Sequence, residues 1–325
     1  MSHEIESRDI QCGLENAWHN LTTVANPVTR EIAHPFEVKP WNIQAVDPNT
    51  LRIVPLDNNK ILLASDDQLP IGLPYQDSYV PNTIANFWKT LDEGMDGAPF
   101  EVVSAGSIRN RAQIFVSIRI TDGFKIGDRE FKDYITLMDS FDKSMAFTCL
   151  YSNVCVVCAN TFSAAMRDGK AIGRAKHSKG FDGNTNRLVQ AIDMFAGYSA
   201  RFNALLSEAN KTLVEEAEAR CWIAGVNCEK AMGLSDLQKV ARMTELFRFG
   251  KGNAGSTRLD AFSGVTDFHS HESVRSTEAN AQWMASEFGT SRLIKGRALD
   301  GLEKWDQFHD RGRGLLKDAG ALIGR

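Results

Sequence analysis

The residues of this sequence best suited to chemistry form a basic run near its middle. Between Ala165 and Gln190 the acidic residues are Asp168 and Asp182, whereas seven side chains can carry positive charge. These are Arg167, Lys170, Arg174, Lys176, His177, Lys179 and Arg187. Glycines recur through the run, and cations on an adaptable backbone can follow a phosphodiester chain without reading its sequence. We therefore interpret the run as a candidate phosphate-binding surface, with a solvated surface loop as the alternative.

Cations that precede this run extend the candidate surface. Two arginines flank the start of a predicted strand, and two more cations lie at a predicted hairpin turn. The complete predicted DNA-binding set is Arg109, Arg111, Lys125, Arg129, Lys170, Arg174, Lys176, His177, Lys179 and Arg187. Bases could stack on nearby aromatic rings, although core positions are the simpler interpretation of each. These rings are Phe124, Phe131, Tyr134 and Phe181.

Cys155 and Cys158 form a C-x-x-C pair. A zinc site needs two further ligands, and Cys221, Cys228 or the His269/His271 pair would supply them at a spacing that matches no zinc finger. A redox role would place the first cysteine at a helix start. The two valines between the cysteines favour a buried strand instead. We expect the six cysteines to be reduced and to act as small buried side chains.

A glycine-rich segment, residues 250–256, precedes a predicted helix. Its Lys251 lies inside the loop, so the residue order of a P-loop is absent. Backbone amides at the start of the following helix could still hold one phosphate. A flexible connection between helices is the alternative.

The densest group of histidines and carboxylates is Asp267, His269, His271 and Glu272. Such a group would suit a metal-dependent nuclease, which we keep as an alternative. We find no nucleophile elbow and no H-E-x-x-H motif. We therefore expect a protein without enzymatic activity, catalytic residues, bound metal or cofactor.

The hydrophobic pattern indicates which elements must position these residues. In residues 113–120, Ile114 and every second residue after it are apolar, which predicts a strand with one buried face. Further strands are predicted at 100–104, 131–139, 144–150 and 152–157, and residues 162–166 follow a helical pattern. Short strands at 51–56 and 60–64 and a helix after Thr83 precede this region, and helices dominate after residue 185. The predicted fold class is α+β, with an antiparallel β-β-β-α core, an N-terminal β-rich segment and a helical C-terminal half.

Charge is distributed unevenly along the chain. Residues 1–100 contain 6 Lys and Arg against 14 Asp and Glu, whereas residues 101–200 contain 13 against 10. A polyanion should therefore meet the middle of the chain, because local charge sets where phosphates are held. We expect four segments. They are an acidic, proline-rich segment (1–99), the core with its basic loop (100–184), a helical region (185–309) and a basic mobile tail (310–325).

Composition favours an ordinary globular protein, with 43% hydrophobic and 24% charged residues. The charged N-terminus lacks the apolar stretch of a secretory signal, and no apolar run is long enough to span a membrane. We therefore expect a location in the host cell cytoplasm and no membrane partner.

Several short segments resemble a known family. They are Ala17-Trp18-His19, the run Asp133–Ser144, the run Val154–Thr161, and the segment from Gly255 to His269. The chain is similar in these blocks, over about Trp18 to Leu302, to the phage/plasmid-like proteins, a family carried by phages and plasmids whose domain has no known function. It departs from the family pattern at Asn153, where the family has Arg, and at Ser263-Gly264, where it has Asn-Ala.

A more distant resemblance concerns topology alone. A β-β-β-α core with a basic face is similar to the single-strand annealing proteins of the Rad and phage recombinase superfamily. This likeness implies an ATP-independent protein that binds and anneals single-stranded DNA as a homo-oligomeric ring or filament. A factor that binds and inhibits a host defence or repair protein is the alternative from another class. In that case the acidic first third would compete with nucleic acid.

Overall fold

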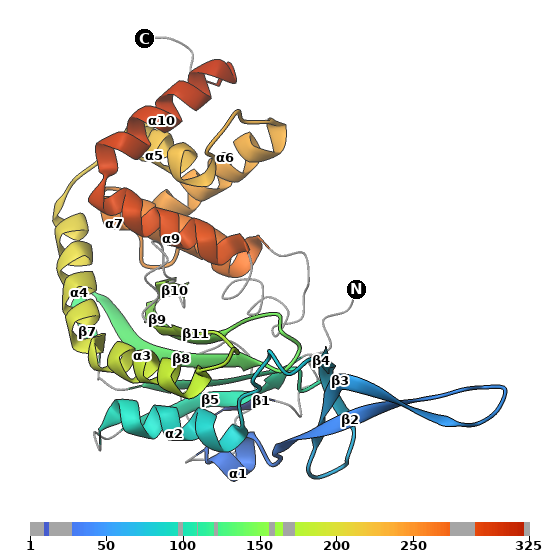
Figure 1. Cartoon of the computed structure of the whole chain (residues 1–325). Helices are drawn as coiled ribbons and strands as arrows, with labels where there is room; N and C mark the ends of the chain where they lie inside the picture. The colour runs from blue at the N-terminus through green and yellow to red at the C-terminus, as the bar shows by residue number, and fades with distance from the viewer. Residues whose placement is uncertain are drawn as a thin grey trace. The chain divides into compact units, whose positions relative to one another are not determined.

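The computed structural model describes residues 10–12, 28–96, 100–108, 110–119, 123–155, 160–164, 173–273 and 290–321. Its contacts divide the chain into two compact units, each assembled from several segments. Unit 1 comprises residues 1–120, 135–150 and 168–195, and unit 2 comprises residues 121–134, 151–167 and 196–325. The described part contains both helices and antiparallel strands, so the α+β prediction is confirmed (Figure 1).

Unit 1 is built on an antiparallel sheet in which the strands pair in the order β1-β5-β6-β8-β9, and β11 also pairs with β9. The strands are β1 (Ile10–Cys12), β5 (Glu101–Ile108), β6 (Gln113–Arg119), β8 (Arg129–Ser140), β9 (Phe147–Cys155) and β11 (Gly173–Ala175). β8 and β9 are long enough to run from one unit into the other. The regions predicted as two strands at 144–150 and 152–157 are therefore largely one continuous strand.

The prediction that β6 has one buried face was wrong, because both of its faces are covered. Phe115 and Ser117, on the face expected to be exposed, are both fully buried. The Ser117 hydroxyl lies 2.7 Å from the Thr136 hydroxyl, and this hydrogen bond lets a polar side chain lie inside the sheet.

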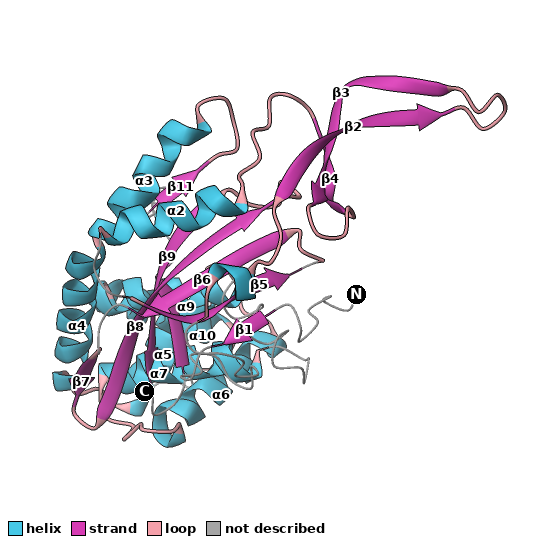
Figure 2. Cartoon of the chain, turned by 90° about the horizontal axis from the view of Figure 1, so that it is seen from below, coloured by secondary structure: helices cyan, strands magenta, loops and turns pink. Residues whose placement is uncertain are grey.

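Helices α2 (Ile84–Met95) and α3 (Phe181–Asp193) pack together in unit 1 (Figure 2). α2 begins where predicted, since the Thr83 side chain caps it by accepting a hydrogen bond from the Asn86 N–H. Phe87 on α2 and Phe181 on α3 both pack against Phe147 of β9. This contact joins the two helices to the sheet. The short helix α1 (Arg30–Ala33) precedes them.

A second sheet in unit 1 contains three strands in the order β2-β3-β4. They are β2 (Val38–Val46), β3 (Ile53–Ala64) and β4 (Pro70–Tyr75), which confirm the predicted N-terminal β-rich segment. Figures 1 and 2 show the β2–β3 hairpin projecting well beyond β4. We call this projecting part, residues 41–61, the arm.

Unit 2 contains two hairpins and most of the helices. β7 (Phe124–Ile126) pairs with β8, and β10 (Asn160–Ala164) pairs with β9. The helices are α4 (Phe195–Lys211), α5 (Glu216–Asn227), α6 (Leu234–Phe249), α7 (Arg258–Asp267), the π-helix η2 (Phe268–Glu272), α9 (Thr290–Glu303) and α10 (Trp305–Asp318). No helix in the described ranges combines the length and the apolar character that a membrane crossing requires.

Two predictions about local structure in unit 2 were wrong. Residues 162–164, predicted as helical, belong to strand β10, because pairing with β9 fixes them in extended backbone. Residues 310–318, predicted to begin a mobile tail, continue α10. Gly312 lets α10 approach α5 so closely that a Cβ at this position would lie 1.8 Å from the Cys221 carbonyl oxygen. The stacked rings of Trp222 and Trp305, 4.8 Å apart, hold the same two helices together.

Candidate nucleic-acid interface

Three exposed cations follow one another at the end of the basic run. Arg174, Lys176 and Lys179 are exposed, whereas Gly173, just before them, and Ala175, between the first two, are buried. A Cβ at Gly173 would lie 2.8 Å from the Leu188 side chain, so β11 packs closely on α3. Residues 173–180, which we call the cationic segment, therefore present positive charge from an anchored backbone.

The anchor of the cationic segment is His177, whose side chain points inward. Its Nε2 lies 2.7 Å from an Asp139 carboxylate oxygen, and its Nδ1 lies 3.0 Å from the Val80 carbonyl oxygen. The Val80 N–H donates in return to the His177 carbonyl oxygen at 3.3 Å. The ring stacks on Phe181 with centroids 4.9 Å apart. Because its side chain is 4% exposed, His177 is a structural clamp and does not present its ring to a phosphate.

The partners of His177 define its protonation state. A carboxylate and a carbonyl oxygen both accept hydrogen bonds, so these two contacts favour the imidazolium form, in which both ring nitrogens carry hydrogen. Burial lowers the pKa of His177, but the Asp139 carboxylate and the Val80 carbonyl oppose this, and the net pKa lies above its ordinary value. Asp139 also accepts from the Asn82 amide and the Ser140 N–H, each at 2.7 Å. The buried ion pair is therefore well supplied with hydrogen bonds.

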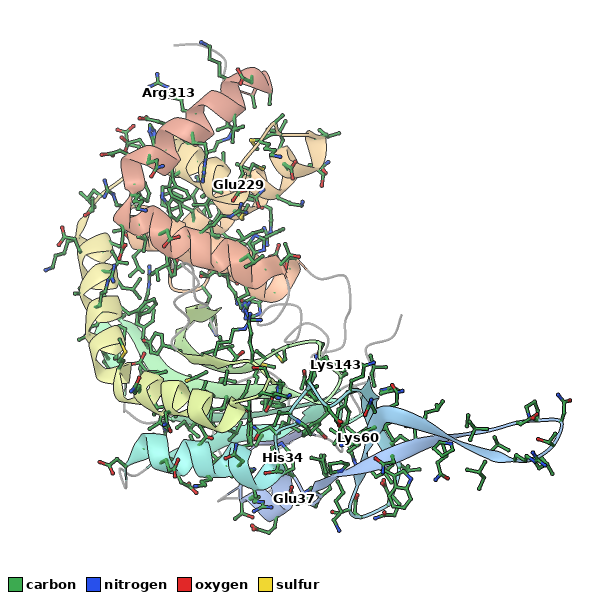
Figure 3. All side chains as sticks on the ribbon, viewed as in Figure 1. His34, Glu37, Lys60, Lys143, Glu229 and Arg313 are labelled. Atoms are coloured by element: carbon green, nitrogen blue, oxygen red, sulfur yellow. The ribbon has the colours of Figure 1, made fainter. Side chains whose placement is uncertain are left out.

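Lys143 is a cation of unit 1 that the sequence reasoning missed. It lies exposed in the turn between β8 and β9, at φ +63°. Its ammonium donates to the Pro74 carbonyl oxygen at 2.7 Å and lies 5.9 Å from the centroid of the Tyr79 ring; Figure 3 labels Lys143. That ring is 4.9 Å from His177, so Lys143 and the cationic segment contact the same aromatic side chain. A lone lysine in a hairpin turn gives no sequence signal for this placement.

Arg111 is held by the acidic part of the chain. Its guanidinium lies 3.1 Å from Asp66 and 3.0 Å from Asp67 and stacks over the Phe36 ring at 5.0 Å. Two carboxylates thus neutralise a cation that was predicted to contact phosphate.

Arg129 is buried in unit 2. Its guanidinium forms an ion pair with Asp260, donates to the Gly252 carbonyl oxygen at 2.9 Å and approaches the Ser263 hydroxyl at 3.3 Å. With a side chain 9% exposed, it is unavailable to a phosphate. The predicted phosphate contact at Arg129 is contradicted by this buried pair.

The glycine-rich loop before α7 is satisfied by the same carboxylate. Asp260 accepts from the backbone N–H groups of Ser256 at 3.0 Å and Thr257 at 3.1 Å. The Asp260 carboxylate therefore already supplies the negative charge that the start of α7 would otherwise attract. The alternative interpretation, a connection between helices, describes this loop better than a phosphate site does.

The other predicted DNA-binding residues are less informative. Lys125 is exposed on β7 and belongs to unit 2, whereas the cationic segment belongs to unit 1. Arg109, Lys170 and the side chain of Arg187 lie outside the described residues, as does Cys158. The aromatic candidates Phe131, Tyr134 and Phe181 are buried, and Phe124 stacks on Phe131 at 5.2 Å. These rings belong to packed cores, as the simpler interpretation held.

The carboxylates and histidines of residues 267–272 interact with different partners. Arg242 binds both carboxylate oxygens of Glu272, at 2.8 and 2.7 Å. His271 lies 3.8 Å from Asp267, and burial raises the pKa of Asp267 to about 6, with a contribution from Glu272. His269 is buried apart, where desolvation and nearby cations lower its pKa to about 3. Among the described residues, no group of three or more potential ligands is placed to hold a metal ion.

The described cysteines are simple core residues. Cys149, Cys221 and Cys228 are free and buried, which confirms the expectation for these three. Burial raises the pKa of the Cys149 thiol to about 12, so this thiol is unreactive.

Comparison with known proteins gives one match. No curated protein and no solved structure matches the chain. The family described as "Domain of unknown function (DUF932)" matches residues 76–287, which begin before α2 and continue through α7 and η2, so the β2–β3–β4 sheet lies outside the match. The N-terminal block at Ala17–His19 lies outside both this match and the described residues. Because the match covers more than half of the sequence, the chain belongs to this family of unknown function.

Proposed function

We propose that this protein binds single-stranded nucleic acid through the cationic segment and Lys143, and that it promotes annealing without ATP in a phage or plasmid setting. The observation that carries the proposal is the exposure of Arg174, Lys176 and Lys179 on one anchored stretch. Within the described part of the chain, no ion pair joins these three side chains to a carboxylate. Exposed cations are what a phosphate chain needs.

The spacing of the cations along the segment suits a polyanion whose own chain is extended. Residues two apart in extended backbone are separated by roughly 6.6 Å, so Arg174 and Lys176 can engage neighbouring phosphates of an extended strand. A flexible loop would lose conformational freedom on binding. The His177 clamp reduces that loss because it orders the segment in advance.

The contacts available to the segment are phosphate contacts. The Phe181 ring already stacks on His177, and the Tyr79 ring packs against His177 at a tilt. The proposed complex therefore leaves the bases free, and pairing with a complementary strand can follow once the repulsion between backbones is reduced. Affinity should depend weakly on base sequence and strongly on salt.

The test is a titration of fluorescently labelled oligo(dT) at several KCl concentrations. For a single strand the slope of log affinity against log salt is about −0.7 for each phosphate neutralised. Replacing all three cations (Arg174→Gln, Lys176→Gln, Lys179→Gln) should reduce that slope by about 2. The same variant should lose the ability to accelerate annealing of complementary oligonucleotides in the absence of ATP.

A matched control separates local from overall charge. Lys211, Lys230 and Lys317 are also exposed and belong to unit 2. Replacing these three by Gln changes the net charge equally and should leave the salt slope unchanged. The proposal fails if the wild-type protein does not bind at low salt, or if the control variant loses as much affinity as the segment variant.

A further inference from the structure

The arm exposes a set of large apolar side chains that the proposed function does not use. Their exposed fractions range from 40% at Leu56 to 76% at Leu51. The set comprises Trp41, Val46, Leu51, Ile53, Val54 and Leu56. Exposed apolar residues are ordinary when scattered, but a contiguous group marks an interaction site. Here all six lie on one hairpin (Figure 2).

At the base of the hairpin, in contrast to the arm, the apolar side chains of the sheet are buried. Val38, Leu62 and Ala64 are buried there, and β4 pairs with β3 from Lys60 to Leu63. Beyond Lys60 no described strand pairs with β3 other than β2. A two-stranded ribbon by itself is marginally stable in water. The arm is therefore the part of unit 1 that gains most from a partner.

Both faces of the arm are apolar near its tip. Val46 is paired with Ile53 and Ala45 with Val54. Directly opposed residues share a face and successive residues alternate, so these two pairs lie on opposite faces. A single flat surface could cover one face alone, whereas a partner that clasps the ribbon covers both.

The edges of the arm are poorly suited to adding another strand. Pro55 in β3 lacks the N–H that a ladder requires, as does Pro40 in β2 just before the arm, and the register shifts between Asn42 and Gln44. Prolines and bulges of this kind protect edge strands from open-ended pairing. The arm is therefore built to dock through its side chains and to form a closed assembly.

The charges of the arm argue against a polyanion as its partner. Residues 41–61 contain Asp47 and Asp57 against Arg52 and Lys60, so they balance. At the tip the Asp47 N–H donates to the Arg52 carbonyl oxygen at 3.0 Å, which places one acidic and one basic residue opposite each other. A two-fold axis between two arms would set Arg52 of each copy against Asp47 of the other.

The area of the apolar surface fits a pair of copies. Scaling the six exposed fractions to whole residues gives roughly 700 Å² on each chain. If the two arms clasp each other so that both faces of each arm are covered, the two surfaces together fall within the range of about 1,200–2,000 Å² that stable interfaces bury. We propose that the arm is a dimerisation element that docks on the arm of a second copy of this chain.

The experiment measures the mass of the full-length protein by light scattering over a dilution series. The wild type should have twice the chain mass of 36.0 kDa and dissociate on dilution. Ile53→Lys combined with Val46→Lys should halve the mass. Leu69→Lys is the matched control, because Leu69 is 61% exposed, close to the 63% of Ile53, but lies outside the arm, and it should leave the mass unchanged.

A second variant guards against an effect of the introduced charges. Replacing residues 45–54 by Asn-Gly shortens the hairpin to a tight turn after Gln44 and should also give a single chain. A wild type of single-chain mass at every concentration overturns the proposal, as does a dimer that survives both arm variants. So does a single-chain protein that sediments through its arm with phosphatidylcholine vesicles, with or without phosphatidylglycerol. The oligonucleotide titration is read independently, so each proposal can fail without the other.

Discussion

Arg129 and Arg174 both follow a glycine-containing stretch, but their side chains differ in exposure to solvent. Arg129 is buried in unit 2 against Asp260, whereas Arg174 is exposed on β11 of unit 1. The difference does not arise from their neighbours in sequence. Asp260 is 131 residues from Arg129 and reaches it through the fold of unit 2. Charge density along a sequence therefore indicates where cations occur, and the fold decides which of them remain available to a ligand.

Among the substitutions that test this comparison, disruption of the buried Arg129–Asp260 pair should cause the largest loss of stability. Replacing Asp260 by Asn leaves the Arg129 guanidinium buried without a counter-ion, and the one remaining side-chain oxygen cannot accept from both the guanidinium and the two backbone amides at the start of α7. We expect a loss of about 3–5 kcal/mol in the free energy of unfolding. Urea denaturation followed by circular dichroism measures it.

An exposed pair in the same unit serves as the control. Arg201 binds Glu303 at 2.6 Å but is 70% exposed. Glu303→Gln should cost less than about 1 kcal/mol. Equal losses in the two variants would contradict the view that burial makes the Arg129 pair structural.

The His177 clamp should give an intermediate effect that depends on pH. His177→Gln removes a buried charged hydrogen bond, which costs about 1.5–3 kcal/mol. Because the folded pKa of His177 is raised, the stabilisation is complete below its ordinary pKa of 6.5 and is lost as the pH rises through the folded value. The wild type should therefore exceed the variant in stability at pH 6 and lose that advantage at higher pH. Urea denaturation of both proteins at intervals from about pH 5.5 to 9 tests this, and a pH-independent difference would show that His177 is not the titrating group.

In unit 1, Arg111 should give a smaller effect than His177, and it sharpens the comparison most. Its guanidinium is paired with Asp66 and Asp67 and stacks on Phe36. Arg111→Gln should cost about 1 kcal/mol of stability and leave oligonucleotide affinity unchanged. A large loss of affinity would show that Arg111 exchanges its carboxylates for phosphates on binding.

The sequence predicted the parts of the structure that depend on local pattern. The cap at Thr83, the strand at β6 and the helical C-terminal half follow from residue spacing over one or two turns. Lys176 and Lys179 are exposed as predicted because lysines in a glycine-rich connection have no nearby apolar surface to join.

The predictions that failed depend on partners far away in sequence. Asp139, the carboxylate that pairs with the buried His177, lies 38 residues earlier in the sequence. Neither residue by itself predicts that the two will interact. Residues 162–164 have an apolar spacing compatible with a helix, but pairing with β9 holds them extended. In α10 the decisive feature is the close approach of Gly312 to α5, which a count of arginines and glycines cannot show.

The interleaving of the two units has a consequence for how the protein is made. Unit 1 needs residues 168–195 to complete its packing, and unit 2 needs residues 121–134. During synthesis α2 emerges about a hundred residues before α3, the helix that packs against it, so the packing of this early segment is completed late. Contacts between such distant segments slow folding, and β8 has to pair with neighbouring strands in both units. The nascent chain should therefore depend on protection from premature association until most of the sequence has left the ribosome.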